Sequence, residues 1–347
     1  MKTIGVSLWD GQLRGAGVNA PTIYRSAVRP PIFSARDLFV DAYPRFADKC
    51  RAFDEPGLAI VAVDATTGRA AGLVRLSARV GRPVTAIVGR HDHCDLFLDN
   101  DARLPLRQLA VVLAPVKSWE RGRPEIHYRV FDLRTQDGVR DEDNRALRGL
   151  RAEGPAILRV GGYVLFMLPI GDPTDWPASA DDAWQQLPER VYLDELTHAP
   201  GGSLSHLKLP KDNGRTRHSV VYRTAGPRDT SVRLAAGEAV GELEITSRDR
   251  SVTFSVGAEA LRDGVLLGRY ARCDAAAGVA EDNSMSRVHL LLVQVDDQLL
   301  AIDTASSRGT KLADSTDGDH VRIAVVEREI SLVLGKRTSV RWRWVAS

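Results

Sequence analysis

The strongest constraint on the fold of this chain is an internal repeat. The segments GRHDHCDL, from Gly89, and GRYARCDA, from Gly268, both read Gly-Arg-x-x-x-Cys-Asp and lie 179 residues apart (268 minus 89). Two of the three cysteines in the chain thereby occupy matching positions. Self-similarity at a fixed separation indicates that one structural unit occurs twice.

The similarity continues downstream in two further blocks. LRQLAVVL matches SRVHLLLV, and DLRTQDGV, from Asp132, matches DTASSRGT, from Asp303. The first copy has nine more residues between these blocks (25 against 16). The surplus falls in the segment PVKSWERGRPE, which predicts a longer hairpin loop. The alignment pairs Leu106 with Ser286, Arg107 with Arg287, Leu109 with His289, Gln136 with Ser307, and Asp137 with Arg308.

Short apolar runs separated by Gly, Asp and Pro surround both copies. GLAIVAV and LVRLSARV precede the first Gly-Arg, as GELEITS and SVTFSV precede the second. Strand-like runs at intervals of about 8 to 12 residues are typical of an all-β sandwich or barrel. We therefore expect an all-β chain with β-sandwiches at 57–170 and 240–347.

The remaining segments match neither copy. Residues 1–56 are expected to form an arm that is partly helical, although Pro44 is expected to break or kink its helix. Residues 171–239 are expected to form an irregular linker, with a short helix that starts at Asp181 and Asp182 and ends before Pro188.

The second copy resembles the forkhead-associated (FHA) domain family. The family pattern is Gly-Arg, then Ser-Arg-x-His, then Asp-x-x-Ser-x-Asn-Gly-Thr. Gly268-Arg269, the segment from Ser286 to His289, and the segment from Asp303 to Thr310 follow this order. The resemblance implies a β-sandwich that binds phosphothreonine peptides through loops at one end, and a tandem FHA protein with a diverged first copy.

The resemblance also implies roles for single residues. Arg269 and Ser286 would contact the phosphate, with Arg287 beside them and Ser307 at a position where the family often has a phosphate-contacting Thr or Ser. A phosphothreonine carries about −1.5 to −2 charges and three acceptor oxygens, which suits guanidinium and hydroxyl donors. Supporting positions in the motif are Gly268, His289 and Gly309.

One motif residue departs from the family pattern. Arg308 stands where the family has the Asn that holds the peptide backbone. A guanidinium donates hydrogen bonds but accepts none, so the two-sided amide contact is lost. We expect phosphopeptide binding to persist with a different preference for the residues that flank the phosphothreonine.

The first copy has lost more of the motif. It keeps Arg90 and Arg107, but Leu106 takes the serine position and provides no hydrogen bond, while the carboxylate of Asp137 repels a phosphate. We expect an FHA-like fold that does not bind phosphothreonine, and that contacts another protein or the second copy instead.

Composition narrows the choice of function. The 47 basic and 45 acidic residues leave a net charge of +2, which does not favour a nucleic-acid partner. Of the basic residues, 40 are Arg and 7 are Lys, an excess that coding bias explains at most positions. The sequence has no nucleophile elbow, Walker loop or zinc-protease motif, so we expect no enzyme and no cofactor.

Cysteines and hydropathy bear on the cellular setting. Cys50, Cys94 and Cys273 are odd in number and far apart, which favours the reducing cytoplasm, and no apolar run is long enough for membrane insertion. The segment from His91 to Asp95 contains metal-ligand residue types, but the second copy lacks both histidines, so no metal site is expected.

The leading hypothesis is a phosphothreonine-dependent adaptor in Ser/Thr kinase signalling. The second copy would bind a phosphorylated partner, and the first copy would serve as a phosphate-independent interaction module. The alternative is a structural scaffold in a bacterial assembly such as a secretion machine, since related domains in bacteria occur in both settings. The oligomeric state stays open.

Overall fold

The computed structural model describes residues 4–5, 24–25, 33–116, 126–195, 218–224, 234–248, 250–276, 282–315 and 320–345. In the N-terminal arm, β1 (Ile4–Gly5) pairs antiparallel with β2 (Tyr24–Arg25). The expected hairpin loop PVKSWERGRPE lies outside the described residues from position 117 onward.

The first sandwich consists of two sheets. The six-stranded sheet has the order β10 (Ala146–Leu147), β9 (Val139–Asp141), β12 (Ala156–Val160), β13 (Tyr163–Ile170), β3 (Gly57–Asp64), β4 (Ala70–Ser77). The seven-stranded sheet has the order β14 (Glu189–Asp194), β15 (His218–Thr224), β11 (Gly149–Ala152), β8 (Tyr128–Asp132), β7 (Leu109–Leu113), β5 (Val84–Gly89), β6 (Leu96–Phe97).

The second sandwich also has two sheets. Its six-stranded sheet has the order β17 (Arg250–Gly257), β16 (Ala239–Ser247), β25 (Thr338–Trp344), β24 (Glu329–Leu334), β21 (Thr310–Leu312), β22 (His320–Val321). Its four-stranded sheet has the order β18 (Val265–Leu267), β19 (Leu290–Val295), β20 (Gln298–Asp303), β23 (Ile323–Val326). The helix α4 (Ala258–Asp263) connects β17 to β18.

The two sandwiches repeat one strand order. β10-β9-β12-β13-β3-β4 corresponds strand by strand to β22-β21-β24-β25-β16-β17. Likewise, β11-β8-β7-β5 corresponds to β23-β20-β19-β18. The prediction of a mostly β chain is confirmed, and the repeat seen in the sequence extends to ten strands of each copy.

Segments outside the repeat complete the first sandwich. β15 pairs antiparallel with β11 and β14 pairs parallel with β15, so residues expected to form a linker extend the sheet. The helix α2 (Ala180–Gln186) lies where the short helix is expected. It begins after Ser179, whose side chain accepts a hydrogen bond from the Asp182 amide. It is preceded by a 3-10 turn, η1 (Pro173–Asp175).

The helix α1 (Ala35–Arg51) runs through Pro44, where the sequence predicted a break or kink. A proline inside a helix removes one backbone hydrogen bond at a cost of about 3 kcal/mol. That loss is offset by packing, because Leu38, Phe39, Tyr43 and Phe46 are all almost fully buried on the sheet below. At the start of the helix, Ser34 and Asp37 form a reciprocal capping box.

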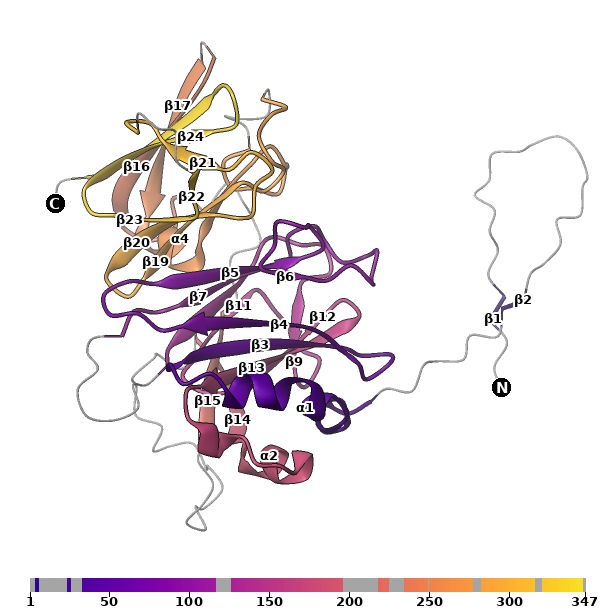
Figure 1. Cartoon of the computed structure of the whole chain (residues 1–347). Helices are drawn as coiled ribbons and strands as arrows, with labels where there is room; N and C mark the ends of the chain where they lie inside the picture. Colours follow the sequence, from indigo (N-terminus) through magenta and orange to yellow (C-terminus); the bar gives the residue numbers. More distant parts are fainter. Residues whose placement is uncertain are drawn as a thin grey trace, which may run out of the picture.

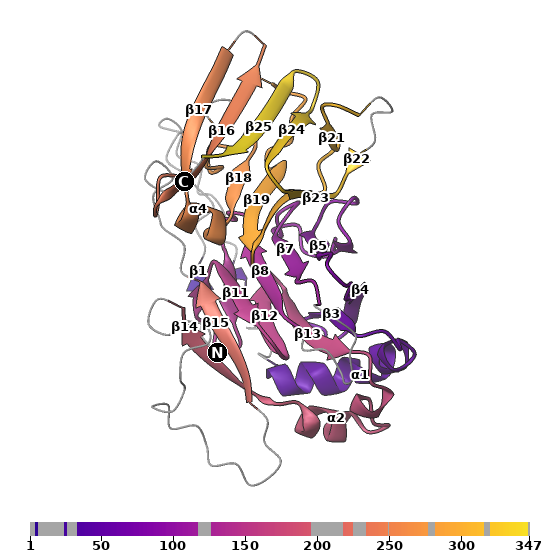
Figure 2. The same cartoon turned by 90° about the vertical axis from the view of Figure 1, so that its left-hand side faces the viewer.

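Four apolar clusters hold five layers together in one stack, with the second sandwich at one end and α1 and α2 at the other (Figures 1 and 2). One cluster fills each sandwich, and a third lies between the helices and the β3 sheet. The fourth lies between the two sandwiches and contains, among others, Ile87, Ala110, Val112, Phe131, Leu266, Leu291, Val293 and Ile302.

The contact between the sandwiches follows from strand alternation. On β7, Leu109 and Val111 face the interior of the first sandwich, whereas Ala110 and Val112 face the second sandwich. The equivalent strand β19 is also apolar on both faces. The first copy therefore contacts the second through equivalent strands, one of the two roles expected for it. Among the described residues, no helix has both the length and the apolar character needed to cross a membrane.

Candidate functional site

Three loop segments meet at one edge of the second sandwich: the two ends of the connection from β18 to β19, and the turn between β20 and β21. The amide of Arg269 donates to the carbonyl of Ser286 at 3.3 Å. The amide of Ser307 donates to the Ser286 hydroxyl oxygen at 3.0 Å. Ser286 thus joins all three segments, and its hydroxyl donates to none of the residues that the structure describes.

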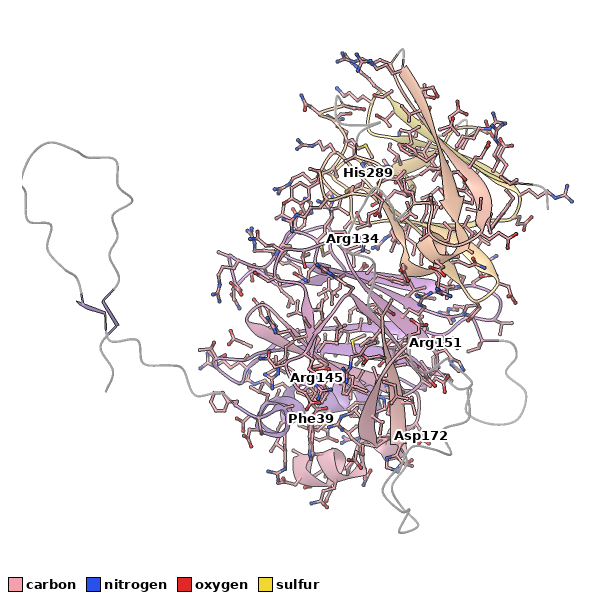
Figure 3. All side chains as sticks on the ribbon, turned by 180° about the vertical axis from the view of Figure 1, so that it is seen from behind. Phe39, Arg134, Arg145, Arg151, Asp172 and His289 are labelled. Carbon is pink, nitrogen blue, oxygen red and sulfur yellow. The ribbon has the colours of Figure 1, made fainter. Side chains whose placement is uncertain are left out.

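His289 supports this edge from below. Its side chain is fully buried, its Nδ1 accepts from the Ser286 amide at 3.1 Å, and its Nε2 lies 3.3 Å from the Gly309 carbonyl (Figure 3). Burial lowers the pKa of His289, while the charge of Asp303 acts in the opposite direction. The neutral ring with its proton on Nε2 satisfies both contacts.

Asp303 fixes the turn that carries Ser307. Its carboxylate accepts from the amide and the hydroxyl of Ser306 at 2.7 and 2.6 Å, and from the Thr310 hydroxyl at 2.7 Å. Ala305 has a φ of 60° and Gly309 a φ of 70°, so the turn enters the left-handed region twice. The turn is therefore held by side chains that are themselves buried.

Gly268 and Cys273 anchor the first loop to the second. A Cβ on Gly268 would lie 2.1 Å from the Arg287 carbonyl oxygen, so only glycine permits this approach. The Cys273 thiol donates to the same carbonyl at 3.3 Å. Burial raises the pKa of Cys273 to about 12, which makes it a structural thiol rather than a reactive one.

The loops enclose a cavity of about 320 Å³. The sequence-predicted residues that line it are Arg269, Ser286, Arg287, Ser307 and Arg308. Of these, Ser286 is buried and the other four are exposed. The Nε of Arg269 donates to the Met285 carbonyl at 2.9 Å, which orients the guanidinium while its terminal amino groups form no hydrogen bond to a described residue.

The same cavity has a wall that the sequence did not predict. His91, Leu106 and Arg107 of the first sandwich line it beside the second-sandwich residues. Four arginines thus face one cavity, and no Asp or Glu is among its described lining residues. No single motif signals such a wall, because it depends on how the two copies pack.

Backbone pairing shows that the alignment of one block of the first copy, LRQLAVVL with SRVHLLLV, is wrong by one residue. The Gln108 amide donates to Val88 as the His289 amide donates to Leu267. The Cys94 thiol donates to the Leu106 carbonyl as Cys273 donates to Arg287. The corrected correspondence is Pro105 with Ser286, Leu106 with Arg287, Arg107 with Val288, and Gln108 with His289.

The correction changes the role of Arg107. Adjacent residues of an extended segment point to opposite sides, so a shift of one residue places each side chain on the opposite side of the segment. Arg107 does not occupy the position of Arg287, and its guanidinium lies against the second sandwich. It is therefore not the remnant of a phosphate site that the sequence suggested.

Gln108 replaces the buried histidine in the first copy. Its amide nitrogen donates to Asp132 at 3.3 Å, to the Thr135 hydroxyl at 2.7 Å and to the Gly138 carbonyl at 3.1 Å. The Gly138 contact is equivalent to that of His289 with Gly309. The scaffold of the loop edge is thus retained with a different polar side chain.

The other predicted residues of the degenerate site are also in place. Arg90 donates through Nε to the Leu104 carbonyl at 3.0 Å, as Arg269 does to Met285. Asp137 is exposed at the position equivalent to Arg308. Pro105 brings neither a hydroxyl nor an amide hydrogen to the serine position.

The ligand-type residues near His91 are used in separate contacts. Asp95 accepts from the Ile87 amide at 2.8 Å and from Arg322 of the second sandwich at 2.6 Å. The buried Cys94 has a pKa raised by burial to about 11. In the described part of the chain, no three His, Cys, Asp or Glu side chains gather as a metal site.

Comparisons with known proteins give fold matches only. No protein-family model matches the chain, and no curated protein is significantly similar to it. The chain is similar to the solved FHA-1 domain of Rv1747 from Mycobacterium tuberculosis, with 21% identity and a TM-score of 0.23, over 31% of this chain and 100% of that one.

Two eukaryotic structures match in the same way. The FHA domain of a hypothetical protein from Arabidopsis thaliana has 19% identity and a TM-score of 0.25, over 35% of this chain and 96% of that one. The yeast Dun1 FHA domain, solved with a doubly phosphorylated peptide derived from Rad53, has 13% identity and a TM-score of 0.27, over 37% of this chain and 80% of that one. At these identities and TM-scores, the matches carry no argument about function.

The motif residues themselves meet in space. Gly268-Arg269, the Ser286–His289 segment and the Asp303–Thr310 turn come together at one edge of a β-sandwich, joined by the hydrogen bonds of Ser286 and His289. The three segments that carry the resemblance are therefore adjacent in the folded chain, in the order of strands that a β-sandwich provides.

Proposed function

We propose that this protein binds phosphothreonine peptides through the loop edge of its second sandwich and acts as an adaptor. One observation carries the proposal: Arg269, Arg287 and Arg308 line one cavity with the hydroxyls of Ser286 and Ser307. A phosphate dianion matches this set, because guanidinium groups supply planar pairs of donors and hydroxyls supply single ones.

The energetics are adequate for a specific complex. A hydrogen bond that involves a charged group contributes about 1.5 to 3 kcal/mol net. Three of them supply much of the ~8 kcal/mol that corresponds to micromolar affinity. The bond from Ser307 to Ser286 and the burial of His289 hold the donors before the ligand arrives, which lowers the entropy lost on binding.

Arg308 gives the proposed site a preference for certain residues beside the phosphothreonine. It is exposed at the rim of the cavity and replaces the Asn of the family pattern. A guanidinium at the rim favours a peptide with an acidic residue beside the phosphothreonine, since it donates to carboxylates in pairs. An acidic flank also matches the absence of Asp and Glu among the described lining residues.

The wider role follows from the two sandwiches together. We propose that a Ser/Thr kinase phosphorylates the partner and that the first sandwich, a diverged copy of the same fold, provides a phosphate-independent interaction surface. Three free, buried cysteines suit a cytoplasmic setting. No catalytic step and no cofactor enter this proposal.

Calorimetry with the full chain tests the proposed site. The probe is a mixture of peptides with a central phosphothreonine and degenerate flanks, compared with the same mixture unphosphorylated. Arg269→Ala is expected to weaken binding at least tenfold. Arg90→Ala is the matched control, because Arg90 makes the equivalent Nε bond in the first sandwich and does not line the cavity.

The outcomes separate the adaptor from the scaffold. Binding that requires the phosphate and Arg269, and that Arg90→Ala leaves unchanged, supports the adaptor. Equal binding of both peptide mixtures, or no loss with Arg269→Ala, contradicts it and favours the alternative of a phosphate-independent scaffold.

A further inference from the structure

The first sandwich reaches into the loop edge of the second. Arg107 is buried between them, and its Nε and Nη2 both donate to the carbonyl oxygen of Ala305, at 3.0 and 2.5 Å. Ala305 lies in the turn between Asp303 and Thr310, two residues before Ser307. One guanidinium of the first copy is thus bonded to the backbone of the turn that carries a proposed phosphate ligand.

The bonded residue is the one whose backbone most needs support. Ala305 has a φ of 60°, a conformation that a residue with a Cβ adopts at a cost of about 1 to 3 kcal/mol unless its surroundings hold it. The Asp303 carboxylate holds the following residue, Ser306, through two bonds. Arg107 holds the carbonyl of Ala305 itself, so the turn is fixed from both sandwiches.

A reciprocal contact supports the same interpretation. Arg134 is the counterpart of Ala305 in the first sandwich and has a φ of 59°. Its carbonyl accepts from Arg272 of the second sandwich at 3.2 Å, and it lies at the boundary between the two sandwiches (Figure 3). Each copy therefore stabilises the left-handed residue in the turn of the other.

Arg107 also brings charge to the cavity. It lines the cavity with Arg269, Arg287 and Arg308, and its Nη1 forms no hydrogen bond to a described residue. Burial lowers the pKa of Arg107, the nearby Cys94 and Asp303 act in the opposite direction, and the charge of Arg287 lowers it. An anion in the cavity offsets both lowering effects, because it stabilises the charged forms of the two side chains.

We infer that the phosphopeptide site is shared between the two sandwiches, with Arg107 of the first copy as a positioning residue that fixes the Asp303–Thr310 turn and adds a fourth positive charge to the phosphate cavity. This inference rests on the proposed function. It means that the diverged copy lost its own hydroxyl donor and serves the site of its neighbour, with His91 and Leu106 as the wall on that side.

The test compares two arginines of the first sandwich. Arg107→Ala removes the bonds to Ala305, and Arg129→Ala is the matched control. Arg129 also donates from the first sandwich to carbonyls of the second, those of Gln294 and Arg262 at 2.9 and 2.7 Å, but it does not line the cavity. Fluorescence polarisation of the labelled phosphothreonine peptide mixture measures affinity for the full chain, and thermal unfolding monitors the fold.

The expected result is a loss of about tenfold in affinity for Arg107→Ala and less than twofold for Arg129→Ala, at similar unfolding temperatures. Arg107→Lys keeps the charge but has one donor nitrogen in place of the planar guanidinium, so it is expected to restore part of the affinity. An unchanged affinity for Arg107→Ala, or an equal loss in both alanine variants, overturns the shared site.

A third variant separates this inference from the proposed function. If Arg269→Ala abolishes binding and Arg107→Ala does not weaken it, the second sandwich binds alone and only the shared site is wrong. If the wild-type chain does not bind the peptide mixture, or Arg269→Ala binds as well as wild type, the proposed function fails and the shared site fails with it.

Discussion

The two sandwiches have the same ten-strand order but differ in what covers their outer sheet. In β3, all seven residues from Gly57 to Val63 are buried. In the equivalent strand β16, buried and partly exposed residues alternate. Helix α1 packs on the β3 sheet, whereas the outer face of the second sandwich has exposed pairs such as Arg343 with Glu242. One topology thus tolerates either a covered or a solvated face.

The loop edges of the two sandwiches also share some residues and differ in others. Both turns keep an aspartate, a hydroxyl residue and a glycine in equivalent positions, since Asp132 and Asp303 each accept from a hydroxyl three residues later. The residues that would meet a ligand differ, with Pro105 in place of Ser286 and Asp137 in place of Arg308. Side chains that build the turn are therefore retained, whereas those at its exposed rim differ between the two copies.

The largest expected effect concerns the covered face. Phe39 of α1 is 1% exposed and its ring lies 5.3 to 5.6 Å, between centroids, from those of Tyr43, Phe46, Phe166 and Trp184. Phe39→Ala is expected to lower the free energy of unfolding of the first sandwich by about 3 to 5 kcal/mol, because it leaves a cavity under the helix. Urea unfolding followed by tryptophan fluorescence measures this loss.

The solvated face provides the control for that experiment. Val252 lies on β17 of the second sandwich and is 40% exposed. Val252→Ala is expected to change the free energy of unfolding by less than about 0.5 kcal/mol, as for other surface substitutions. Similar losses in the two variants would mean that α1 does not cover the first sandwich as a layer of its core.

A smaller effect is expected from the side chain that supports each turn. His289→Ala removes the contacts to Ser286 and Gly309, and Gln108→Ala removes those to Asp132, Thr135 and Gly138. Each is expected to cost about 1 to 3 kcal/mol, because buried polar groups are left without partners.

The exchange of one side chain for the other tests their equivalence. A glutamine offers one acceptor and one donor group, as the neutral ring of His289 does. His289→Gln is therefore expected to unfold at a higher urea concentration than His289→Ala. An equal loss in the two variants would show that the ring shape, and not its hydrogen bonds, supports the turn.

Sequence patterns predicted much of the fold because strand periodicity and turn residues are local signals. The sequence predicts strands in both GLAIVAV and GELEITS. GLAIVAV is apolar throughout, which is typical of a strand covered on both faces, whereas GELEITS alternates apolar and polar residues, which is typical of a strand covered on one face. The roles of α1, β14 and β15 could not be predicted. A strand that pairs with the edge of a sheet has the same local sequence pattern as a strand in a linker, so the pattern does not reveal the pairing.

The alignment predicted for the segment around Arg107 was wrong for a physical reason. Gly89 precedes Gln108 by 19 residues, whereas Gly268 precedes His289 by 21, so this stretch of the first copy is two residues shorter. Pairing Arg107 with Arg287 makes it only one residue shorter. Aligning Arg107 with Arg287 matched residue type but reversed the direction of the side chain. Hydrogen bonds to Val88 and Leu267 define the register, and these are known only from the folded chain.

The smallest expected effect is a pH dependence confined to the second sandwich. Burial lowers the pKa of His289 from its ordinary 6.5, and the opposing charge of Asp303 limits that shift. As pH falls below 6.5, the unfolded chain takes up a proton at His289 before the folded chain does, so the second sandwich loses stability.

That loss levels off once the pH is below the folded pKa, and it is absent above 6.5. Gln108 does not titrate, so His289→Gln is expected to remove this part of the pH dependence while other groups keep theirs. Urea unfolding of wild type and His289→Gln at pH 7.5 and pH 5.5 measures the difference. If the two chains lose the same free energy between these pH values, the buried histidine is not the group that distinguishes the two turns.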